Sequence, residues 1–346
     1  MSRVLWKGEY FFPAFDNMVK TIAIIGLGSI GNRYLEILEK EYPNVTLVIV
    51  RSKKENINLD MQSKHKIIYS IKKLLDLNVN VAIITSPSSM HLEQANFLVR
   101  SGIHVLIEKP LSDSLKGVKK FANLVTENGI VALVGYMFRF DPCALAFKNC
   151  IEKKIVGKVL HVRVESRSFL PKWRPGRDYQ KSVSASIKLG GGVLLELSHE
   201  LDYINWFFRK TKFLYAQLYN SGQLNIEVEE SADLILKNQM GFNIYVHLSF
   251  NSPFIERKCS IIGSNGILEW DLIKKTISYK LVDGKEKIQK FEFERNDLFK
   301  HQINHFFDCV ENRSKPIVSI NDGLDALKLV EASKLSSLHN KTIYLK

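Results

Sequence analysis

Between residues 21 and about 140, short apolar runs rich in β-branched residues alternate with segments whose apolar side chains recur at helical spacing. Such alternation is typical of βαβ units, whose strands form a parallel sheet covered by helices. It predicts an α/β domain with a doubly wound parallel sheet. The predicted strands are Ile22–Ile25, Val45–Val50, Val81–Thr85, His104–Ile107 and Val131–Gly135, and the predicted helices are Asn32–Lys40, His91–Arg100 and Asp113–Asn128.

The pattern changes after Pro142, where stretches that alternate every second residue replace the βαβ pattern. With turn residues between them, they predict an α+β domain with a large, mostly antiparallel open sheet and helices to one side. The predicted strands are Lys158–Ser168, Phe213–Tyr219, Val228–Leu236, Phe242–Phe250, Arg257–Ile262 and Gly266–Leu272. The predicted helices are Ala144–Lys153, Gly192–Phe208, Asp297–Asn312 and Asp322–Leu338.

Chain length agrees with two domains, because 346 residues are more than one hydrophobic core usually serves. We expect them at residues 18–140 and 141–346, with the last helix packing back on the first domain. No apolar run approaches the roughly 18 residues of a membrane span, so we expect no membrane partner. The first 17 residues lack the apolar core of a signal peptide. Met18-Val19-Lys20 lies just before the first strand, which suggests the hypothesis that translation starts at Met18.

The net charge of +13 raises the question of a nucleic-acid partner. The basic residues are spread along the whole chain without a basic arm or a recognised motif, so we expect none. A basic surface, an anionic small substrate or cofactor, or both, explain the charge. The four cysteines show no Cys-x-x-Cys spacing and no clustering with histidine. They predict neither a metal site nor a disulfide framework and fit a reducing cytoplasm.

The first strand leads into Gly26-Leu27-Gly28-Ser29-Ile30-Gly31, a Gly-x-Gly-x-x-Gly loop followed by a helix. A strand that ends on such a loop lets the backbone approach a pyrophosphate, and the N–H groups of the next helix point at it. The flanking strand and helix favour dinucleotide binding. We expect the contacts from Gly26, Gly28, Ser29, Ile30 and Gly31.

The second strand is followed by Arg51-Ser52-Lys53-Lys54. Enzymes that select NAD usually place an acidic residue here to bind the ribose 2′-hydroxyl, whereas a basic residue suits a 2′-phosphate. A solvated charge run is the alternative. We therefore expect NADP in preference to NAD, with Arg51 and Ser52 among the cofactor contacts.

Two further blocks carry reactive side chains. The fourth strand runs into Glu108-Lys109-Pro110, and a lysine at the carboxyl end of a parallel strand faces the crevice where ligands bind. The alternative is an ordinary surface lysine. The other block, Gly190-Gly191-Gly192 to Tyr203, contains Glu196, His199 and Asp202 at spacings of three, which predicts one helical face. The acids could orient His199 or tune its pKa, although a lone helical histidine is more often structural.

Together these blocks resemble the glucose-fructose oxidoreductase/inositol dehydrogenase (Gfo/Idh/MocA) family. The resemblance rests on Gly26–Gly31, the Pro87-x-x-x-His91 turn, Glu108-Lys109-Pro110, and Gly190–Gly192 with His199, in that order. It extends through Lys315-Pro316 and Asp322-Gly323 to Ala332 and spans residues 18–346.

The resemblance implies a Rossmann domain, an open-sheet α/β domain, and oxidation or reduction of sugars or cyclitols with NAD or NADP. It implies that Lys109 lies beside the reacting carbon and that His199 is the acid/base. It further implies cofactor contacts from Thr85, Ser86, Pro87, His91, Glu108, Lys109 and Arg139. Family members often pair through the exposed face of the second sheet, so a homodimer or homotetramer is expected.

Two positions depart from the family pattern. The family usually has Asp four residues before the histidine, where this chain has Leu195; Glu196, three before, either substitutes as a catalytic residue or leaves the triad incomplete. Met137 stands where a polar residue is common. The Glu-x-Ser-His-Glu-x-Asp form resembles a branch associated with bacterial surface-sugar synthesis.

The segment upstream of the glycines contains Trp173, Arg174, Arg177 and Tyr179, which we expect to bind substrate together with His199 and Asp202. The cations Arg174, Arg177 and Lys181 suit a carboxylate or phosphate, and a solvated basic loop is the alternative. The expected reaction is hydride transfer between a nicotinamide and a secondary alcohol or ketone of a sugar, amino sugar or sugar nucleotide. The alternatives are an NAD-retaining glycosidase of the same fold and a non-catalytic dinucleotide-binding regulator.

Overall fold

The computed structural model describes residues 2–5, 19–52, 64–209 and 211–345, and the chain divides into two compact units. The parallel-sheet unit comprises residues 9–137 and 294–324, and the open-sheet unit comprises residues 1–8, 138–293 and 325–346. Residues 294–324, which the sequence pattern placed in the second domain, thus belong to the parallel-sheet unit.

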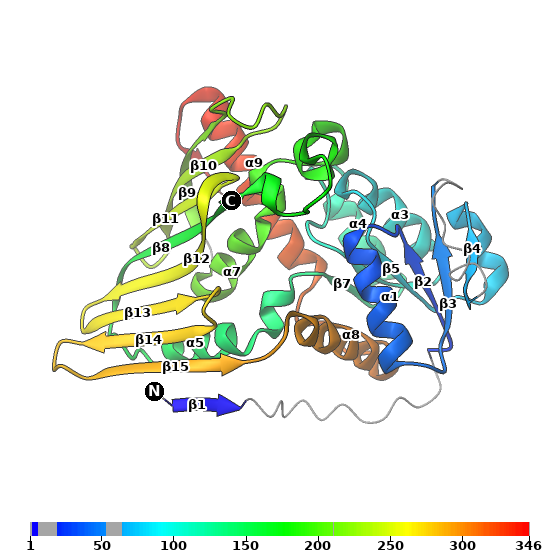
Figure 1. Cartoon of the computed structure of the whole chain (residues 1–346), viewed down its shortest axis with the longest axis horizontal. Coiled ribbons are helices and arrows are strands. Elements are labelled where there is room, and N and C mark those ends of the chain that lie inside the picture. Colours follow the sequence, from blue (N-terminus) through cyan, green and yellow to red (C-terminus); the bar gives the residue numbers. More distant parts are fainter. Residues whose placement is uncertain (1, 6–18, 53–63, 210, 346) are drawn as a thin grey trace. The chain divides into compact units, whose positions relative to one another are not determined.

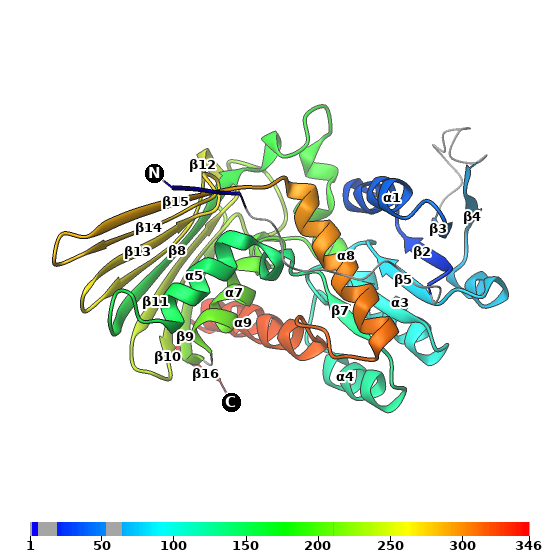
Figure 2. The same cartoon turned by 90° about the horizontal axis from the view of Figure 1, so that it is seen from below.

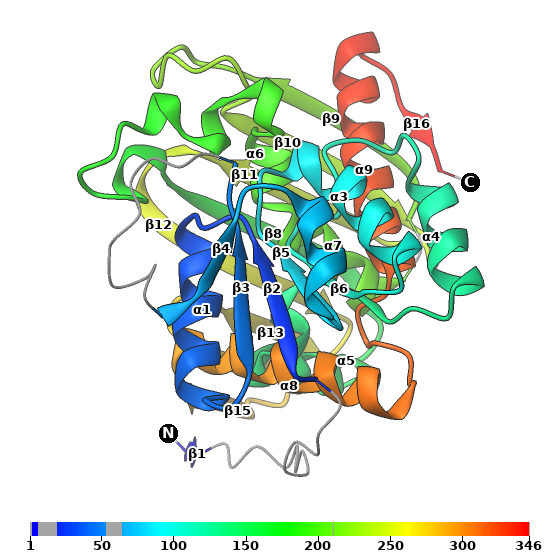
Figure 3. The same cartoon turned by 90° about the vertical axis from the view of Figure 1, so that its right-hand side faces the viewer.

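The parallel-sheet unit is built on six described strands in the order β4-β3-β2-β5-β6-β7, and every neighbouring pair is parallel. Figure 3 labels the strands β2 to β6 of this sheet. The central strands are apolar and buried, as expected where helices cover both faces of a sheet. The strand order reverses between β2 and β5, because β3 and β4 lie on one side of β2 and β5, β6 and β7 lie on the other. Ligands bind at such a topological switch point. The strands are β2 (Thr21–Ile25), β3 (Thr46–Val50), β4 (Lys66–Ile68), β5 (Val81–Ile84), β6 (His104–Ile107) and β7 (Ala132–Val134).

Helices cover both faces of this sheet, with α1 and α8 on one face and α3 and α4 on the other (Figure 2). Aromatic side chains join α1 to α8: the ring centroids of Tyr34 and Phe299 are 5.4 Å apart. The helices are α1 (Ser29–Glu41), α3 (Ser88–Arg100), α4 (Val118–Glu127) and α8 (Arg295–Asn312), with a 3₁₀ segment η1 (Ile71–Leu77).

The open-sheet unit is built on ten described strands in the order β1-β15-β14-β13-β12-β8-β11-β10-β9-β16. Neighbours are antiparallel except for β1 with β15 and β11 with β8. The strands are β1 (Ser2–Leu5), β8 (Val159–Phe169), β9 (Thr211–Tyr219), β10 (Ser231–Asn238), β11 (Asn243–Ser249), β12 (Asn251–Gly263), β13 (Gly266–Asp271), β14 (Thr276–Leu281), β15 (Glu286–Glu292) and β16 (Ile343–Tyr344).

Helices α5, α7 and α9 lie on one face of the open sheet (Figure 1). Aromatic side chains of α5 and α7 meet the sheet around Trp270, which is fully buried and lies 5.3 Å from Tyr203 and 5.9 Å from Phe147 between ring centroids. The helices are α5 (Pro142–Glu152), α6 (Val193–Glu196), α7 (Ser198–Phe208) and α9 (Ile320–His339). None of the helices that the structure describes is long and apolar enough to cross a membrane.

The structure confirms the predicted fold class, a doubly wound parallel sheet followed by a mostly antiparallel open sheet. One predicted helix, Gly192–Phe208, is wrong as a continuous element because the backbone at Leu197 leaves helical geometry (φ −99°, ψ 28°) and separates α6 from α7. The sequence analysis also missed β14 and β15. Most side chains of β15 are exposed, so it lacks the alternation that marks a half-buried strand.

Candidate active site

The glycine loop follows β2, and two of its glycines have no space for a side chain. A Cβ on Gly31 would lie 2.2 Å from the Gly26 carbonyl oxygen, and one on Gly26 would lie 2.9 Å from the Ser86 nitrogen. Gly26 also has a φ of +91°, which only glycine adopts readily. Thr85 Oγ1 donates a hydrogen bond to the Gly26 carbonyl at 2.6 Å. The chain's own packing therefore requires both glycines.

The outer side of the loop is open. A Cβ on Gly28 would meet no described atom within 4 Å. Gly28 is the N-cap of α1, no side chain caps the helix there, and no acidic residue lies in the first turn, which begins with Ser29 and Ile30. The N–H groups and the positive dipole end of this helix suit an anion. A dinucleotide pyrophosphate fits this cradle.

Arg51 directly follows β3, and its backbone nitrogen donates to the Ile68 carbonyl at 2.9 Å. This bond extends the pairing of β3 with β4 and fixes where the Arg51 side chain starts. Arg51 is half-buried and Ser52 is exposed. Lys53 and Lys54 lie outside the described residues. An arginine in this position can form paired hydrogen bonds with a phosphate.

The turn after β5 contains Thr85, Ser86 and Pro87, and Pro87 is the N-cap of α3. Ser86 Oγ donates to Gln94 Oε1 at 2.6 Å. His91 on the first turn of α3 is buried, with Nδ1 2.8 Å from the Pro110 carbonyl oxygen and Nε2 2.7 Å from the Ser86 carbonyl oxygen. Burial lowers the pKa of His91 although the two carbonyl groups oppose this. Its ring therefore contacts the chain itself.

Glu108 ends a chain of buried hydrogen bonds that begins on α8. Gln302 Nε2 donates to the Tyr34 hydroxyl at 2.6 Å, and this hydroxyl donates to Glu108 Oε1 at 2.7 Å. The backbone nitrogen of Lys109 donates to Glu108 Oε2 at 3.1 Å. Burial raises the pKa of Glu108, and the Tyr34 hydroxyl and Lys109 partly offset this. Both carboxylate oxygens are thus held before any ligand binds.

Lys109 comes immediately after this glutamate, and its peptide bond to Pro110 is cis. Its side chain is half-buried. Since β2, β5 and β6 are neighbouring parallel strands, the glycine loop, the Thr85 turn and Lys109 lie at the same edge of one sheet. This is the edge at which open α/β sheets bind ligands.

In the open-sheet unit, His199 lies in the first turn of α7 and is buried. Its ring packs against Phe138, with centroids 4.5 Å apart. Glu196 is the last residue of α6 and is half-buried. The prediction that Glu196, His199 and Asp202 share one helical face is wrong for Glu196, because the helix ends between it and His199.

Asp202 and Arg139 form a buried ion pair. Arg139 donates from Nε to Asp202 Oδ2 at 3.1 Å and from Nη2 to Oδ1 at 2.6 Å. The guanidinium also lies over the ring of Trp206, 5.4 Å from its centroid. The pair fixes α7 to the segment that enters the open-sheet unit. The substrate contact expected of Asp202 and the cofactor contact expected of Arg139 stay predictions.

Sequence reasoning missed a second ion pair beside His199, between a buried glutamate and a half-buried arginine. Glu200 is fully buried, and it accepts from Arg257 Nε at 2.6 Å and from Nη2 at 2.9 Å. The Arg257 guanidinium also lies 4.5 Å from the centre of the Phe138 ring that packs against His199. Burial alone lowers the pKa of Arg257, but the Glu200 carboxylate outweighs it and raises the pKa. No spacing signal connects strand residue Arg257 with helix residue Glu200.

Two of the three consecutive glycines have no space for a side chain because of contacts within the chain. A Cβ on Gly191 would lie 2.4 Å from the Val183 carbonyl oxygen, and one on Gly192 would lie 2.5 Å from Glu229 Oε1. Glu229 Oε1 accepts from the backbone nitrogen of Leu194 at 3.2 Å. Protein atoms therefore occupy the space beside Gly191 and Gly192, and the packing of the chain itself requires glycine at both positions.

The expected substrate segment is a series of short 3₁₀ turns. Trp173 Nε1 donates to Ser168 Oγ at 2.8 Å, and the Tyr179 hydroxyl donates to the Leu224 carbonyl at 3.1 Å. Arg174 is half-buried and Arg177 is exposed. The polar groups of Trp173 and Tyr179 thus support the segment, and their contacts with substrate stay predictions.

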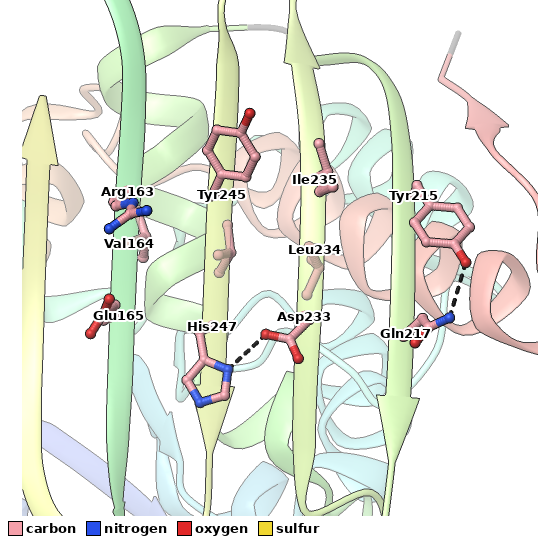
Figure 4. Close-up of a pocket in the computed structure, with 11 residues that line it drawn as sticks. Arg163, Val164, Glu165, Tyr215, Gln217, Asp233, Leu234, Ile235, Tyr245 and His247 are labelled. Atoms are coloured by element: carbon pink, nitrogen blue, oxygen red, sulfur yellow. Dashed lines mark hydrogen bonds and ion pairs between the residues drawn. The ribbon is translucent and has the colours of Figure 1, made fainter. Parts of the chain in front are cut away.

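The outer face of the open sheet carries a hollow of about 330 Å³ (Figure 4). Across β9, β10 and β11, Tyr215, Ile235 and Tyr245 lie in register and form one row. In the next row His247 Nδ1 lies 2.7 Å from Asp233 Oδ1. This face lacks the glycine loop and the reactive lysine. Among the described residues, no group of His, Cys, Asp and Glu side chains could hold a metal ion.

Comparison with known proteins agrees with a Rossmann domain followed by a second, C-terminal domain. The family model for the oxidoreductase family with an NAD-binding Rossmann fold matches residues 20–136, and the model for the GFO/IDH/MocA C-terminal domain matches residues 144–269. Myo-inositol 2-dehydrogenase of Thermotoga maritima is 24% identical over 341 residues, which cover 94% of this chain and 98% of that protein.

Two solved structures share the fold over nearly the whole chain. The myo-inositol 2-dehydrogenase of Lactobacillus plantarum has a TM-score of 0.80 at 19% identity and covers 95% of this chain and 100% of its own. The WlbA dehydrogenase of Bordetella pertussis, in complex with NADH and UDP-GlcNAcA, has a TM-score of 0.82 at 18% identity, with 96% and 99% covered. The chain is thus a member of the Gfo/Idh/MocA family of oxidoreductases, whose first domain is an NAD-binding Rossmann fold.

Proposed function

We propose that this protein transfers a hydride between a nicotinamide cofactor and a secondary alcohol or ketone of a sugar, a cyclitol or a sugar derivative. One observation carries the proposal: Lys109 lies two residues after the end of β6, at the edge of the sheet where the Gly26–Gly31 loop follows β2. A cation at this edge stabilises negative charge on the oxygen of the reacting carbon, in a substrate bound beside the cofactor.

The cofactor would be held by the open side of the glycine loop at Gly28, by the first turn of α1 and by Arg51. When bound, the nicotinamide supplies the hydride acceptor in oxidation and the hydride donor in reduction. Hydrogen bonds from the Tyr34 hydroxyl and the Lys109 backbone nitrogen orient the Glu108 carboxylate. In this orientation it would accept a hydrogen bond from a hydroxyl group of the nicotinamide ribose. A negative first-turn residue would repel the pyrophosphate, and α1 has none there.

His199 is the proposed acid/base. In oxidation it takes the proton from the substrate hydroxyl, and in reduction it returns that proton. Lys109 stabilises the negative charge that develops on the same oxygen. Glu196, the last residue of α6, is the acid proposed to assist His199.

The names of the relatives and the charge of this chain support the proposed substrate class. Myo-inositol 2-dehydrogenase acts on a cyclitol, and the WlbA structure contains a UDP-sugar. Arg174, Arg177 and Lys181 suit the phosphate or carboxylate of such a substrate, although the Asp178 carboxylate lies 3.4 Å from Lys181. We therefore include anionic sugar derivatives of the kind used in bacterial surface-sugar synthesis.

The proposed preference for NADP rests on Arg51 and on the lack of an acidic residue at the end of β3. Calorimetric titration of the protein with NADP and with NAD tests this preference. We expect NADP to bind more tightly by about tenfold, the value of one charge-assisted contact. Arg51→Ala should abolish the difference. Tighter binding of NAD by the unaltered protein would overturn the preference.

We also propose a homo-oligomer in a reducing compartment, the cytoplasm. The row of Tyr215, Ile235 and Tyr245 on the outer sheet face supplies apolar surface for a second copy. All four cysteines are free thiols, and three of them are buried. Free buried thiols fit a reducing environment.

The proposed reaction is tested by following reduced-nicotinamide absorbance with myo-inositol, scyllo-inositol, amino sugars and UDP-linked sugars. We expect turnover with one of these classes, and we expect Lys109→Ala to remove at least 99% of it, about 3 kcal/mol of transition-state stabilisation. Dinucleotide affinity should change little in that variant. Normal turnover by Lys109→Ala would overturn the role of the lysine.

The same measurement separates the alternatives. Cofactor that copurifies with the protein, together with glycoside cleavage and no net absorbance change, would indicate the NAD-retaining glycosidase. Tight dinucleotide binding without turnover of any substrate class would indicate a regulator.

A further inference from the structure

His91 joins two turns that the proposed reaction uses. Its Nδ1 lies 2.8 Å from the carbonyl oxygen of Pro110, the residue after Lys109, and its Nε2 lies 2.7 Å from the carbonyl oxygen of Ser86. One imidazole thus bridges the turn after β5 and the turn after β6. These turns are neighbours at the carboxyl edge of the parallel sheet.

The Ser86 turn in turn supports the glycine loop. A Cβ on Gly26 would lie 2.9 Å from the Ser86 nitrogen, so the two backbones are already in close contact. Thr85 Oγ1 donates to the Gly26 carbonyl at 2.6 Å. A displacement of Ser86 therefore displaces the loop that would hold the pyrophosphate. A displacement of Pro110 displaces Lys109.

The burial of His91 shows how it acts. Only 1% of its surface is exposed, and both ring nitrogens contact the chain's own carbonyl groups. Both ring nitrogens thus serve contacts within the chain, and the cofactor contact expected of His91 stays a prediction. Carbonyl oxygens only accept, so each contact needs an N–H on the ring. The imidazolium has two N–H groups and can donate to both carbonyl oxygens. The neutral ring has one N–H group and donates to one carbonyl oxygen or the other.

We propose that His91 is a positioning residue, which sets Lys109 through Pro110 and sets the glycine loop through Ser86. The inference rests on the proposed function, since it gives one side chain control over both the reactive lysine and the cofactor cradle. It predicts that the two effects can be separated by replacing one ring nitrogen at a time.

Two substitutions make this separation. In His91→Asn the amide nitrogen stands near the position of Nδ1 and can keep the bond to Pro110 while losing Ser86. In His91→Gln the amide nitrogen stands near the position of Nε2 and can keep the bond to Ser86 while losing Pro110. The pair therefore tests the two contacts whichever nitrogen carries the proton.

The expected results differ in kind. His91→Gln should lower kcat about 10- to 100-fold, since misplacing a reactive group by about 1 Å costs this much, and should leave the Kd for NADP and NAD unchanged. His91→Asn should raise the Kd for these dinucleotides about tenfold, as for one lost hydrogen bond, with a smaller effect on kcat. Calorimetry gives the Kd, and the absorbance assay gives kcat.

A spectroscopic measurement keeps the test independent of any substrate. Reductive methylation with ¹³C-formaldehyde labels the lysines, and the Lys109 signal is identified by its loss in Lys109→Arg. The signal should move in His91→Gln and stay in His91→Asn. His104→Asn is the matched control, because His104 is also buried but begins β6 at the opposite end of the strand. It should change neither the lysine signal nor the dinucleotide Kd.

The proposal would be overturned if the two His91 variants changed the Lys109 signal equally and the dinucleotide Kd equally. Loss of a merely structural histidine should affect both measurements alike in both variants. No effect of either variant would also overturn the proposal. If Lys109→Ala retains full turnover while the His91 variants still split the signal and the Kd, the proposed role of Lys109 fails and the positioning role of His91 stands.

Discussion

His104 shows how the environment of one residue couples stability to pH. Its Nδ1 accepts from the Val131 nitrogen at 2.9 Å, and burial, aided by the Arg313 guanidinium, lowers its pKa from 6.5 to about 4. Because the folded pKa lies below the unfolded one, the contribution of neutral His104 is complete above about pH 6.5. It is lost as the pH falls towards about 4. Urea unfolding between pH 7 and pH 4 should show this decline.

His104→Asn keeps an acceptor for Val131 but does not titrate, so its stability should decline less steeply over the same range. The decline should be reduced and not removed, since burial also lowers the pKa of His91, His301 and His305. A slope identical to that of the unaltered protein would show that His104 does not carry this dependence.

Single residues were predictable from sequence where a motif fixes them and unpredictable where a distant partner does. The glycine loop and Lys109 follow strand ends, and the sequence pattern located those ends. The ion pair of Glu200 and Arg257 joins residues 57 positions apart, and no periodicity connects them. His91 was found by its motif, but its partners are backbone carbonyl groups, which carry no sequence signal.

Among the elements, the strands of the parallel sheet were the most predictable because burial on both faces makes them continuous apolar runs. The break between α6 and α7 could not be foreseen. Leu197 is a good helix former, so no local signal in the sequence marks the break at this residue. The strands β14 and β15 lie near one edge of the open sheet, where exposed charged side chains obscure the alternation.

The ion pair between α7 and β12 should contribute to stability through the cost of breaking it. Glu200 is fully buried, so Arg257→Met leaves a carboxylate without its cation and should lower the free energy of unfolding by about 3–5 kcal/mol. Adding Glu200→Gln removes the buried charge, and the double variant should recover part of this loss. Urea unfolding of the parent, the two single variants and the double variant gives the coupling energy between Glu200 and Arg257.

Arg167→Met is the matched control for this cycle. Arg167 also contacts a glutamate, Glu256, but 42% of its side chain is exposed. Exposed ion pairs contribute up to about 1 kcal/mol, so this variant should unfold almost as the parent does. A double variant less stable than Arg257→Met alone would contradict the argument from the buried charge.

At the scale of the whole chain, the two units are not two consecutive segments. Residues 294–324 return to the parallel-sheet unit, where Val134 donates to the Val318 carbonyl at 3.2 Å and Gly323 packs on Leu111. A Cβ on Gly323 would lie 3.0 Å from the Leu111 side chain, next to the turn that carries Lys109. Sequence patterning identified α8 as a helix, but the expected return to the first domain named the last helix and not α8.

The outer face of the open sheet is where assembly of copies should be decided. Ile235 pairs in register with Tyr215 on one side and Tyr245 on the other, and 42% of its surface is exposed. If this row packs against a second copy, Ile235→Lys places a charge in an apolar contact and should reduce the assembly to single chains. Sedimentation equilibrium measures the mass directly.

The hairpin tip between β10 and β11 provides the control. Met240 is 73% exposed, and Met240→Lys adds the same charge away from the row, so this variant should keep the mass of the parent. A parent protein that sediments as a single chain, or an Ile235→Lys variant that keeps the parent's mass, would exclude this face as the site of assembly. Loss of mass in Ile235→Lys with an unchanged dinucleotide Kd would place assembly on the open sheet, separate from the cradle at the edge of the parallel one.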